Sequence, residues 1–182
     1  MKKLTFITGN SKKAEQLALH FAIPVEHTKL DLEEIQSLDI EAITIDKARR
    51  AYDILKSPVL VEDTSLTFHA LGSLPGPLIK WFLTSLGNEK MCHLLDSYED
   101  RSATAEVCFC IYDEHGHHTF RGQIQGTIGL SPKGDTGFGF DPIFIPDGYD
   151  KSWGEMNAEE QAATSMRKIA LAKLTLFLNE QK

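Results

Sequence analysis

The chain has 182 residues, 42% of them hydrophobic and 25% charged, a balance that suits a globular domain with a substantial core. Its net charge of −7 argues against a general polyanion-binding surface, so we expect no nucleic-acid partner. No apolar run approaches the roughly 20 residues that span a bilayer, and the first strand is too short for a signal sequence, so we expect a cytoplasmic protein without a membrane partner.

The first predicted unit is a strand, a polar loop and a helix. Leu4-Thr5-Phe6-Ile7 is typical of a buried strand, and Thr8-Gly9-Asn10-Ser11-Lys12-Lys13 ends it. Apolar residues then recur at helical spacing from Ala14 to Phe21. Unpaired N–H groups and two lysines at a helix N-terminus favour an anion, although most such junctions bind nothing and the P-loop spacing is absent.

Two adjacent carboxylates follow the next predicted elements. A strand is expected over 25–30, and a helix over 39–56. The strand from Pro58 to Val61 delivers Glu62 and Asp63 to its C-terminal end, where open α/β sheets form ligand crevices. Beyond this pair the strand is expected to continue into Leu66-Thr67-Phe68. Polar residues that end a strand are usually structural, so this pair indicates a functional site only when other segments of the chain support it.

Alternating apolar residues predict a long hairpin, with strands over 103–111 and 120–128 and a turn over 113–116. This region also holds candidate zinc ligands, namely Cys108, Cys110, His115, His117 and His118. The turn puts the histidines opposite the end of the strand, away from Cys108, so buried thiols are favoured over zinc. Three cysteines fit a reducing compartment.

Two further motifs lie near the C-terminus. In Phe138-Gly139-Phe140-Asp141-Pro142 an exposed ring could stack on a planar base, or the rings could form an aromatic plug beneath a turn. The last helix is predicted to begin near Asn157, with Glu160 completing a capping box. Its apolar stripe, which is expected to pack inward, comprises Ala163, Met166, Ala170, Leu174 and Phe177.

Five segments occur in an order and spacing that resemble one known family. They are Thr8–Lys13, Val61–Thr64, Gly72–Pro77, Phe138–Pro142 and Pro146–Tyr149. The chain resembles the inosine triphosphate pyrophosphatase family, and the run from Leu71 to Phe82 is most similar to its eukaryotic branch. The resemblance implies an α/β fold: a long twisted mixed β-sheet flanked by helices, with two lobes and a central cleft in one domain over 1–182. It also implies a homodimer.

The family hydrolyses non-standard purine nucleoside triphosphates (ITP, dITP and XTP) to the monophosphate and pyrophosphate, with Mg²⁺. By resemblance, Glu34 and Asp63 would hold the metal, and Asp63, helped by Glu62, would orient the attacking water. Which of these two is the general base stays open. The residues expected to contact phosphate are Thr8, Gly9, Asn10, Lys13 and Lys47. Those expected to contact the rest of the nucleotide are Phe138, Phe140, Asp141, Gln161, Ser165, Met166 and Arg167.

Three positions depart from the family pattern. Met166 stands where the family has histidine, Gln161 where it has lysine, and Phe140 where many members have tryptophan. Helical spacing makes Met166 a core residue, whereas the resemblance aims it at the cleft, and the sequence supports both. An alternative function is therefore a nucleotide-binding protein of the same fold with lost or altered catalysis, although the paired carboxylates favour an enzyme.

Overall fold

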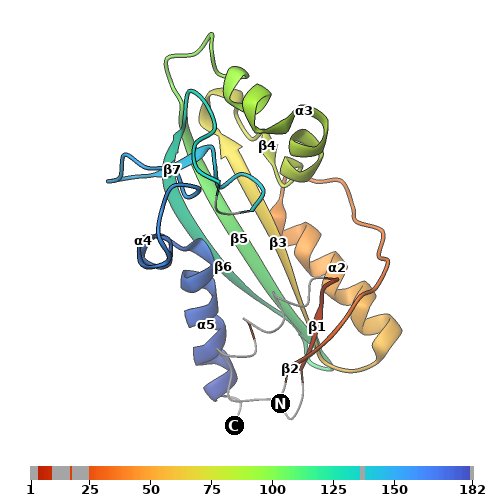
Figure 1. Ribbon diagram of the computed structural model, residues 1–182. Coiled ribbons are helices and arrows are strands. Elements are labelled where there is room, and N and C mark those ends of the chain that lie inside the picture. The colour runs from red at the N-terminus through yellow and green to blue at the C-terminus, as the bar shows by residue number, and fades with distance from the viewer. Residues whose placement is uncertain (1–3, 10–16, 18–24, 136–137, 181–182) are drawn as a thin grey trace. The chain divides into compact units, whose positions relative to one another are not determined.

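The computed structural model describes residues 4–9, 17, 25–135 and 138–180 (Figure 1). Its strands are β1 (Leu4–Ile7), β2 (Val25–Thr28), β3 (Val59–Phe68), β4 (Pro75–Gly76), β5 (Ser102–Asp113), β6 (Gly116–Ile128) and β7 (Phe144–Pro146). Its helices are α2 (Ile40–Leu55), α3 (Ile79–His93), α4 (Ala158–Ala163), α5 (Met166–Glu180) and a 3-10 turn, η1 (His69–Leu71). Apart from the buried Leu17, the helix expected after the first loop lies outside the described residues.

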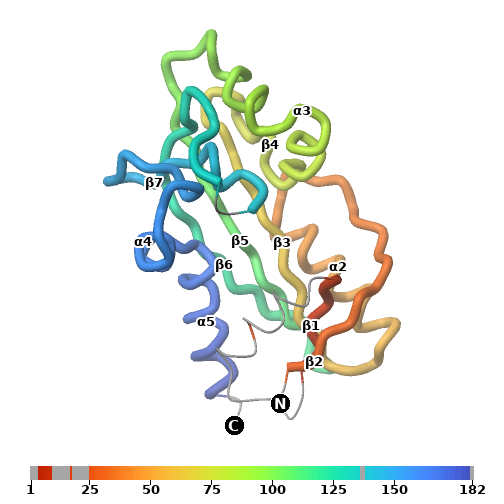
Figure 2. The backbone as a smooth tube through the Cα atoms, viewed as in Figure 1, coloured from red at the N-terminus to blue at the C-terminus, as the bar shows by residue number. Residues whose placement is uncertain are grey.

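The strands form one mixed sheet in the order β2-β1-β3-β5-β6-β7, and β4 pairs with β3. β1 is parallel to both β2 and β3, whereas the β3/β4 and β6/β7 pairs are antiparallel. A two-residue turn at 114–115 joins β5 to β6, where the hairpin was expected (Figure 2). The predicted mixed α/β sheet with helices is confirmed. No helix in the described part of the chain is long and apolar enough to cross a membrane.

The described chain divides into two compact units. Unit 1 comprises residues 1–63, 107–121 and 169–182, and unit 2 comprises 64–106 and 122–168. β3, β5 and β6 each contribute residues to both units. That these units form one two-lobed domain remains a prediction.

The core of unit 1 joins α2 to the sheet. Ala48 and Ala51 of α2 pack with Val59 and Val61 of β3 in one buried cluster. α2 begins where the Asp39 side chain accepts hydrogen bonds from the N–H groups of residues 41 and 42, at 2.9 and 3.3 Å. The predicted helix is thus confirmed, and its boundaries follow from a local cap and from apolar spacing.

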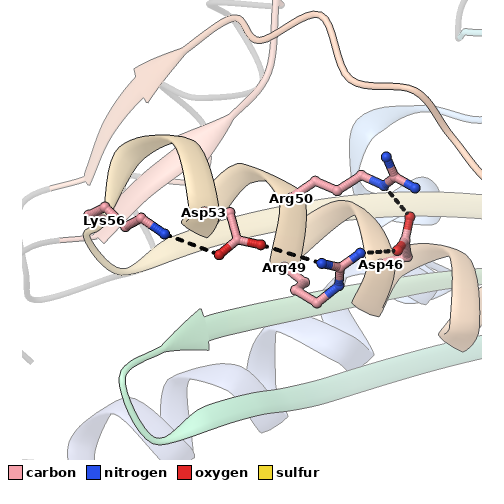
Figure 3. Close-up of polar contacts among 5 residues, drawn as sticks. All are labelled: Asp46, Arg49, Arg50, Asp53 and Lys56. Atoms are coloured by element: carbon pink, nitrogen blue, oxygen red, sulfur yellow. Dashed lines mark hydrogen bonds and ion pairs between the residues drawn. The ribbon is translucent and has the colours of Figure 1, made fainter.

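The exposed face of α2 carries a ladder of ion pairs (Figure 3). Asp46 pairs with Arg49 at 2.8 Å and with Arg50 at 2.6 Å. Asp53 pairs with Arg49 at 3.4 Å and with Lys56 at 3.2 Å. These spacings of three and four residues place neighbours on one helix face, so both guanidinium groups have acidic partners on α2, and Arg50 also lies 4.0 Å from Glu33.

The C-terminal helix differs from the prediction in one respect. The capping box of Asn157 and Glu160 is present, but the helix ends at Ala163, which is exposed, and α5 starts at Met166. The prediction of a single continuous helix was therefore wrong. Thr164 accounts for the break: its hydroxyl accepts a hydrogen bond from the Trp153 indole at 2.9 Å and donates to a carbonyl of α4.

All three cysteines are free and buried. Burial raises the pKa of the Cys110 thiol to about 12, which keeps it protonated at neutral pH. No cluster of three or more Cys, His, Asp or Glu residues within the described ranges could hold a metal ion. Buried thiols, the favoured interpretation, are thus what the structure shows.

Candidate functional site

The carboxylate pair lies inside a strand. β3 runs without interruption from Val59 to Phe68, which confirms the predicted continuation of the strand to Phe68, although Glu62 and Asp63 lie inside the strand and not at its C-terminal end. The strand continues because Leu66 and its neighbour pair with β4. On the other side, β1 pairs with β3 only at Val59 and Leu60, and β1 itself ends at Ile7. The register therefore puts the carboxylates just beyond the end of β1.

A buried lysine lies between acidic side chains in unit 1. The ammonium group of Lys47 lies 2.6 Å from Glu34 Oε1 and 3.9 Å from Asp63 Oδ2. Only 18% of the Lys47 side chain and 20% of the Asp63 side chain are exposed. Burial alone would lower the pKa of Lys47, but the charges of Asp63, Glu34 and Glu62 outweigh it and raise the pKa. Lys47 is therefore a charged group inside an acidic cluster.

These residues come from three segments: the connection over 29–39, α2 and β3. Helix lysines are usually solvated, so spacing alone gave no reason to expect this burial. The donor set is chemically suited to Mg²⁺, because the ion prefers oxygen ligands and needs only one or two carboxylates beside phosphates and water. In this structure the cation between Glu34 and Asp63 is the ammonium group of Lys47.

The loop after β1 is described only as far as Gly9. The Thr8 N–H donates to the Thr28 carbonyl at 2.9 Å, which continues the pairing of β1 with β2. A Cβ atom placed on Gly9 would lie 3.3 Å from Cδ of Lys29, so the lysine stem covers this glycine. Lys29 is a basic residue that sequence reasoning missed, because its proximity depends on strand pairing. Asn10 and Lys13 lie outside the described residues.

In unit 2 the two phenylalanines of the Phe138–Asp141 loop differ. Phe138 is 76% exposed, whereas Phe140 is 7% exposed and lies 6.2 Å from the Trp153 ring. The two sequence-based interpretations therefore apply to different residues: Phe138 presents an exposed ring, and Phe140 anchors the loop.

Asp141 closes this loop. Its carboxylate accepts a hydrogen bond from the Phe138 N–H at 2.6 Å. Burial raises the pKa of Asp141, and the hydrogen bond from Phe138 and the charge of Arg167 oppose this only in part. Unit 2 thus brings Phe138, Phe140, Asp141 and Arg167 into one neighbourhood.

The other candidates of unit 2 lie around the α4–α5 junction. Gln161 donates from Nε2 to the Trp153 carbonyl at 2.7 Å. Ser165 accepts a hydrogen bond from the N–H of Lys168 in the first turn of α5, at 3.2 Å. Met166 is 9% exposed, and a thioether so covered offers little surface to a ligand. Gln161 and Met166 therefore both have structural contacts, and their roles toward a nucleotide remain predictions.

Two more residues of unit 2 were missed. Trp153 packs 4.5 Å from the Phe144 ring as well as on Phe140, and it bonds to Thr164. It could have been suspected, because the chain has two tryptophans. Asn88 of α3 donates from Nδ2 to the Gly139 carbonyl at 3.0 Å, and nothing in its sequence context suggests this contact.

Comparison with known sequences gives consistent matches over nearly the whole chain. The sequence model of the Ham1 family matches residues 4–177. The inosine triphosphate pyrophosphatase of Neurospora crassa is 46% identical over 175 residues, which cover 94% of this chain and 90% of that protein. The inosine triphosphate pyrophosphatase of Yarrowia lipolytica is 45% identical over 184 residues, covering 98% of this chain and 96% of that protein.

Solved structures are similar over the same length. A HAM1 protein from Coxiella burnetii has a TM-score of 0.88 at 27% identity, covering 99% of this chain and 100% of that one. A nucleoside-triphosphatase, dITP/XTP pyrophosphatase, from Mycobacterium abscessus has a TM-score of 0.80 at 27% identity, covering 94% and 98%. The Staphylococcus aureus Ham1 protein, at 24% identity, a TM-score of 0.87 and full coverage of both chains, shows the shared fold alone.

Proposed function

Because this chain belongs to the Ham1 family, we propose that it hydrolyses the non-standard purine nucleoside triphosphates ITP, dITP and XTP to the monophosphate and pyrophosphate. The family resemblance predicted from the sequence is confirmed by these matches. The observation that carries the proposal within the structure is the buried Lys47, held between Glu34 and Asp63. A cation beside carboxylates supports this proposal, since a triphosphate-hydrolysing site must neutralise phosphate charge and also position a base.

We assign the phosphate chemistry to unit 1. Glu34 and Asp63 would hold Mg²⁺, which when bound neutralises charge on the phosphate oxygens. Lys47 would then exchange its hydrogen bond to Glu34 for one to a phosphate oxygen. Thr8 and Gly9, with the loop residues Asn10 and Lys13, would hold the remaining phosphates through N–H groups and positive charge.

The reaction proposed is attack by water on the α-phosphorus. A bond forms between the water oxygen and the α-phosphorus, and the bond from that phosphorus to the bridging oxygen breaks. Pyrophosphate leaves with the electron pair of the broken bond. Asp63 would orient the water and take its proton, with Glu62 beside it in β3.

We assign recognition of the nucleoside to unit 2. The exposed ring of Phe138 would stack on a purine, whereas Phe140 anchors the loop by packing beside Trp153. Asp141, Ser165 and Arg167 would supply polar groups to the nucleoside, and Gln161 and Met166 would contact it as well. Where the family has a lysine and a histidine, this chain would offer an amide and an apolar contact.

We further propose that the protein acts in the cytoplasm as a homodimer. Three buried free thiols fit a reducing compartment. The dimer is an expectation from the family resemblance, and light scattering of the purified protein tests it: a mass near 20.3 kDa would contradict the dimer.

The decisive experiment is a substrate panel of ITP, dITP, XTP, ATP and GTP, scored for pyrophosphate with and without Mg²⁺. We expect pyrophosphate from the first three, only when Mg²⁺ is present. Release without metal would contradict the assignment of Glu34 and Asp63. Tight nucleotide binding with no pyrophosphate from any substrate would instead identify the alternative, a binding protein with lost catalysis.

A further inference from the structure

An amide in α3 holds the loop that carries the exposed ring of Phe138. α3 is interrupted at Gly87, whose φ of 72° and ψ of 166° lie outside the helical region and favour glycine. Asn88 follows this kink, and its Nδ2 group donates to the Gly139 carbonyl at 3.0 Å. The contact joins residues that lie 51 positions apart in the sequence, so it is tertiary.

The two polar atoms of the Asn88 amide have different surroundings. Its Oδ1 atom is buried and has no hydrogen-bond donor among the described residues. A buried carbonyl oxygen without a hydrogen-bond donor lowers the stability of the fold. Packing alone therefore does not explain an asparagine at this position. Within the described part of the chain, the Asn88 side chain donates to the Gly139 carbonyl, and this contact ties the loop to α3.

Several contacts hold this loop in place. Asn88 holds the Gly139 carbonyl, the Asp141 carboxylate holds the Phe138 N–H at 2.6 Å, and the Phe140 ring packs beside Trp153. Asp141 and Phe140 belong to the loop, so Asn88 is the attachment that comes from α3. Phe138 remains 76% exposed above these contacts.

We propose that Asn88 is a positioning residue that sets the place of Phe138, and so the affinity for the nucleoside part of the substrate. This inference rests on the proposed function. A ring held rigidly gives more binding energy to a planar base, because less freedom is lost when the base arrives. Asn88 does not belong to the phosphate-binding residues of unit 1, so it acts on nucleoside binding and leaves phosphate binding unchanged.

The test uses Asn88→Leu, which removes both the donor and the unpaired acceptor at similar size. We expect the KM for ITP to rise about tenfold, the scale of a lost hydrogen bond with a displaced contact, while kcat changes less than about twofold. Inorganic tripolyphosphate, an inhibitor without a base, should keep its inhibition constant. The melting temperature should stay unchanged or rise, because the unpaired carbonyl is gone.

Two further variants keep the result interpretable. Asn88→Asp keeps the shape of the side chain and replaces the donor with an acceptor, so it should give the same rise in KM if Asn88→Leu fails to fold. Thr84→Val is the matched control, because the Thr84 hydroxyl donates to the Lys80 carbonyl within the same helix at 2.8 Å. It should leave the KM for ITP unchanged.

The outcomes separate the two proposals. A wild-type protein that releases no pyrophosphate from ITP overturns the proposed function, and this inference with it. An active wild type with an unchanged KM in Asn88→Leu overturns the inference alone. It is overturned as well if the inhibition constant of tripolyphosphate rises as much as the KM, since the substitution would then disturb the whole site.

Discussion

In unit 1, Lys47, Glu34 and Asp63 are held together by charge, whereas in unit 2 the Phe138 loop is held by single hydrogen bonds and by ring packing. Burial therefore has different outcomes for the charged side chains of the two regions. Around Lys47, opposite charges outweigh the cost of burial, and the charged form is favoured. At Asp141, burial is the larger effect, and the charged form is disfavoured.

This difference assigns distinct tasks to the two regions. A cluster of compensated charges can exchange one partner for a phosphate or a metal ion without exposing a bare charge. A loop with few ionic contacts can place an aromatic ring without attracting anions. Substitutions in unit 1 should therefore lower turnover, and substitutions in unit 2 should alter affinity, specificity or stability.

The largest effect is expected for Asp63→Asn. Loss of a positioned base or metal ligand should lower kcat at least about a hundredfold, while the protein still folds. Steady-state kinetics with ITP and a thermal melt measure the two quantities. Asp53→Asn is the matched control among the exposed ion pairs of α2 and should leave kcat unchanged. Near wild-type turnover in a folded Asp63→Asn protein would contradict the assignment of Asp63 as base or metal ligand.

Lys47→Met tests the charge compensation directly. The substitution leaves Glu34 and Asp63 without their cation, so we expect kcat/KM for ITP to fall on the order of tenfold to a hundredfold. Lys56→Met is the control, because Lys56 forms one exposed pair with Asp53. If both variants lose activity equally, the buried position of Lys47 has no special role.

Specificity in unit 2 should shift in the double variant Gln161→Lys/Met166→His. An apolar contact discriminates bases by only about 1–3 kcal/mol, whereas hydrogen-bonded readout discriminates strongly. We therefore expect wild type to prefer ITP and XTP over ATP and GTP only modestly, and the double variant to raise the preference about tenfold. The measurement is kcat/KM for the four nucleotides.

The outcome that contradicts this expectation is specific. If wild type already separates ITP from ATP several thousandfold, and the double variant leaves that ratio unchanged, Met166 serves only in core packing. Gln161→Lys alone is the companion variant, because Gln161 also bonds to the Trp153 carbonyl.

The smallest effect concerns stability. Because the pKa of Asp141 is raised in the folded protein, its neutral form is favoured there, and its contribution to stability is lost as the pH rises through the raised pKa. Asp141→Asn should raise the free energy of unfolding at neutral pH by about 1 kcal/mol, the lower end of the cost of a poorly satisfied buried group. Urea unfolding measures it, and the difference should vanish below the ordinary aspartate pKa. A difference independent of pH would contradict this account.

Sequence reasoning worked where the cause was local. Asp39 caps α2 through residues two and three positions away, so the start of that helix could be predicted. It failed where the cause was distant, because the break at Thr164 depends on a hydrogen bond from Trp153. Site residues follow the same rule. Residue type suggested Glu62 and Asp63, but the burial of Lys47 and the contacts of Asn88 and Lys29 arise only from tertiary structure.

The ion-pair ladder of α2 has a consequence for how a substrate reaches this protein. Arg49 and Arg50 pair with acidic residues of the same helix (Figure 3). The remaining basic residue of α2 is Lys47. With a net charge of −7, the molecule offers a triphosphate little long-range attraction. Within α2, capture then depends on short-range exchange at the ammonium group of Lys47. Ionic strength, which screens exposed charges beyond about 10 Å, should therefore slow the encounter far less than in an enzyme with a basic surface.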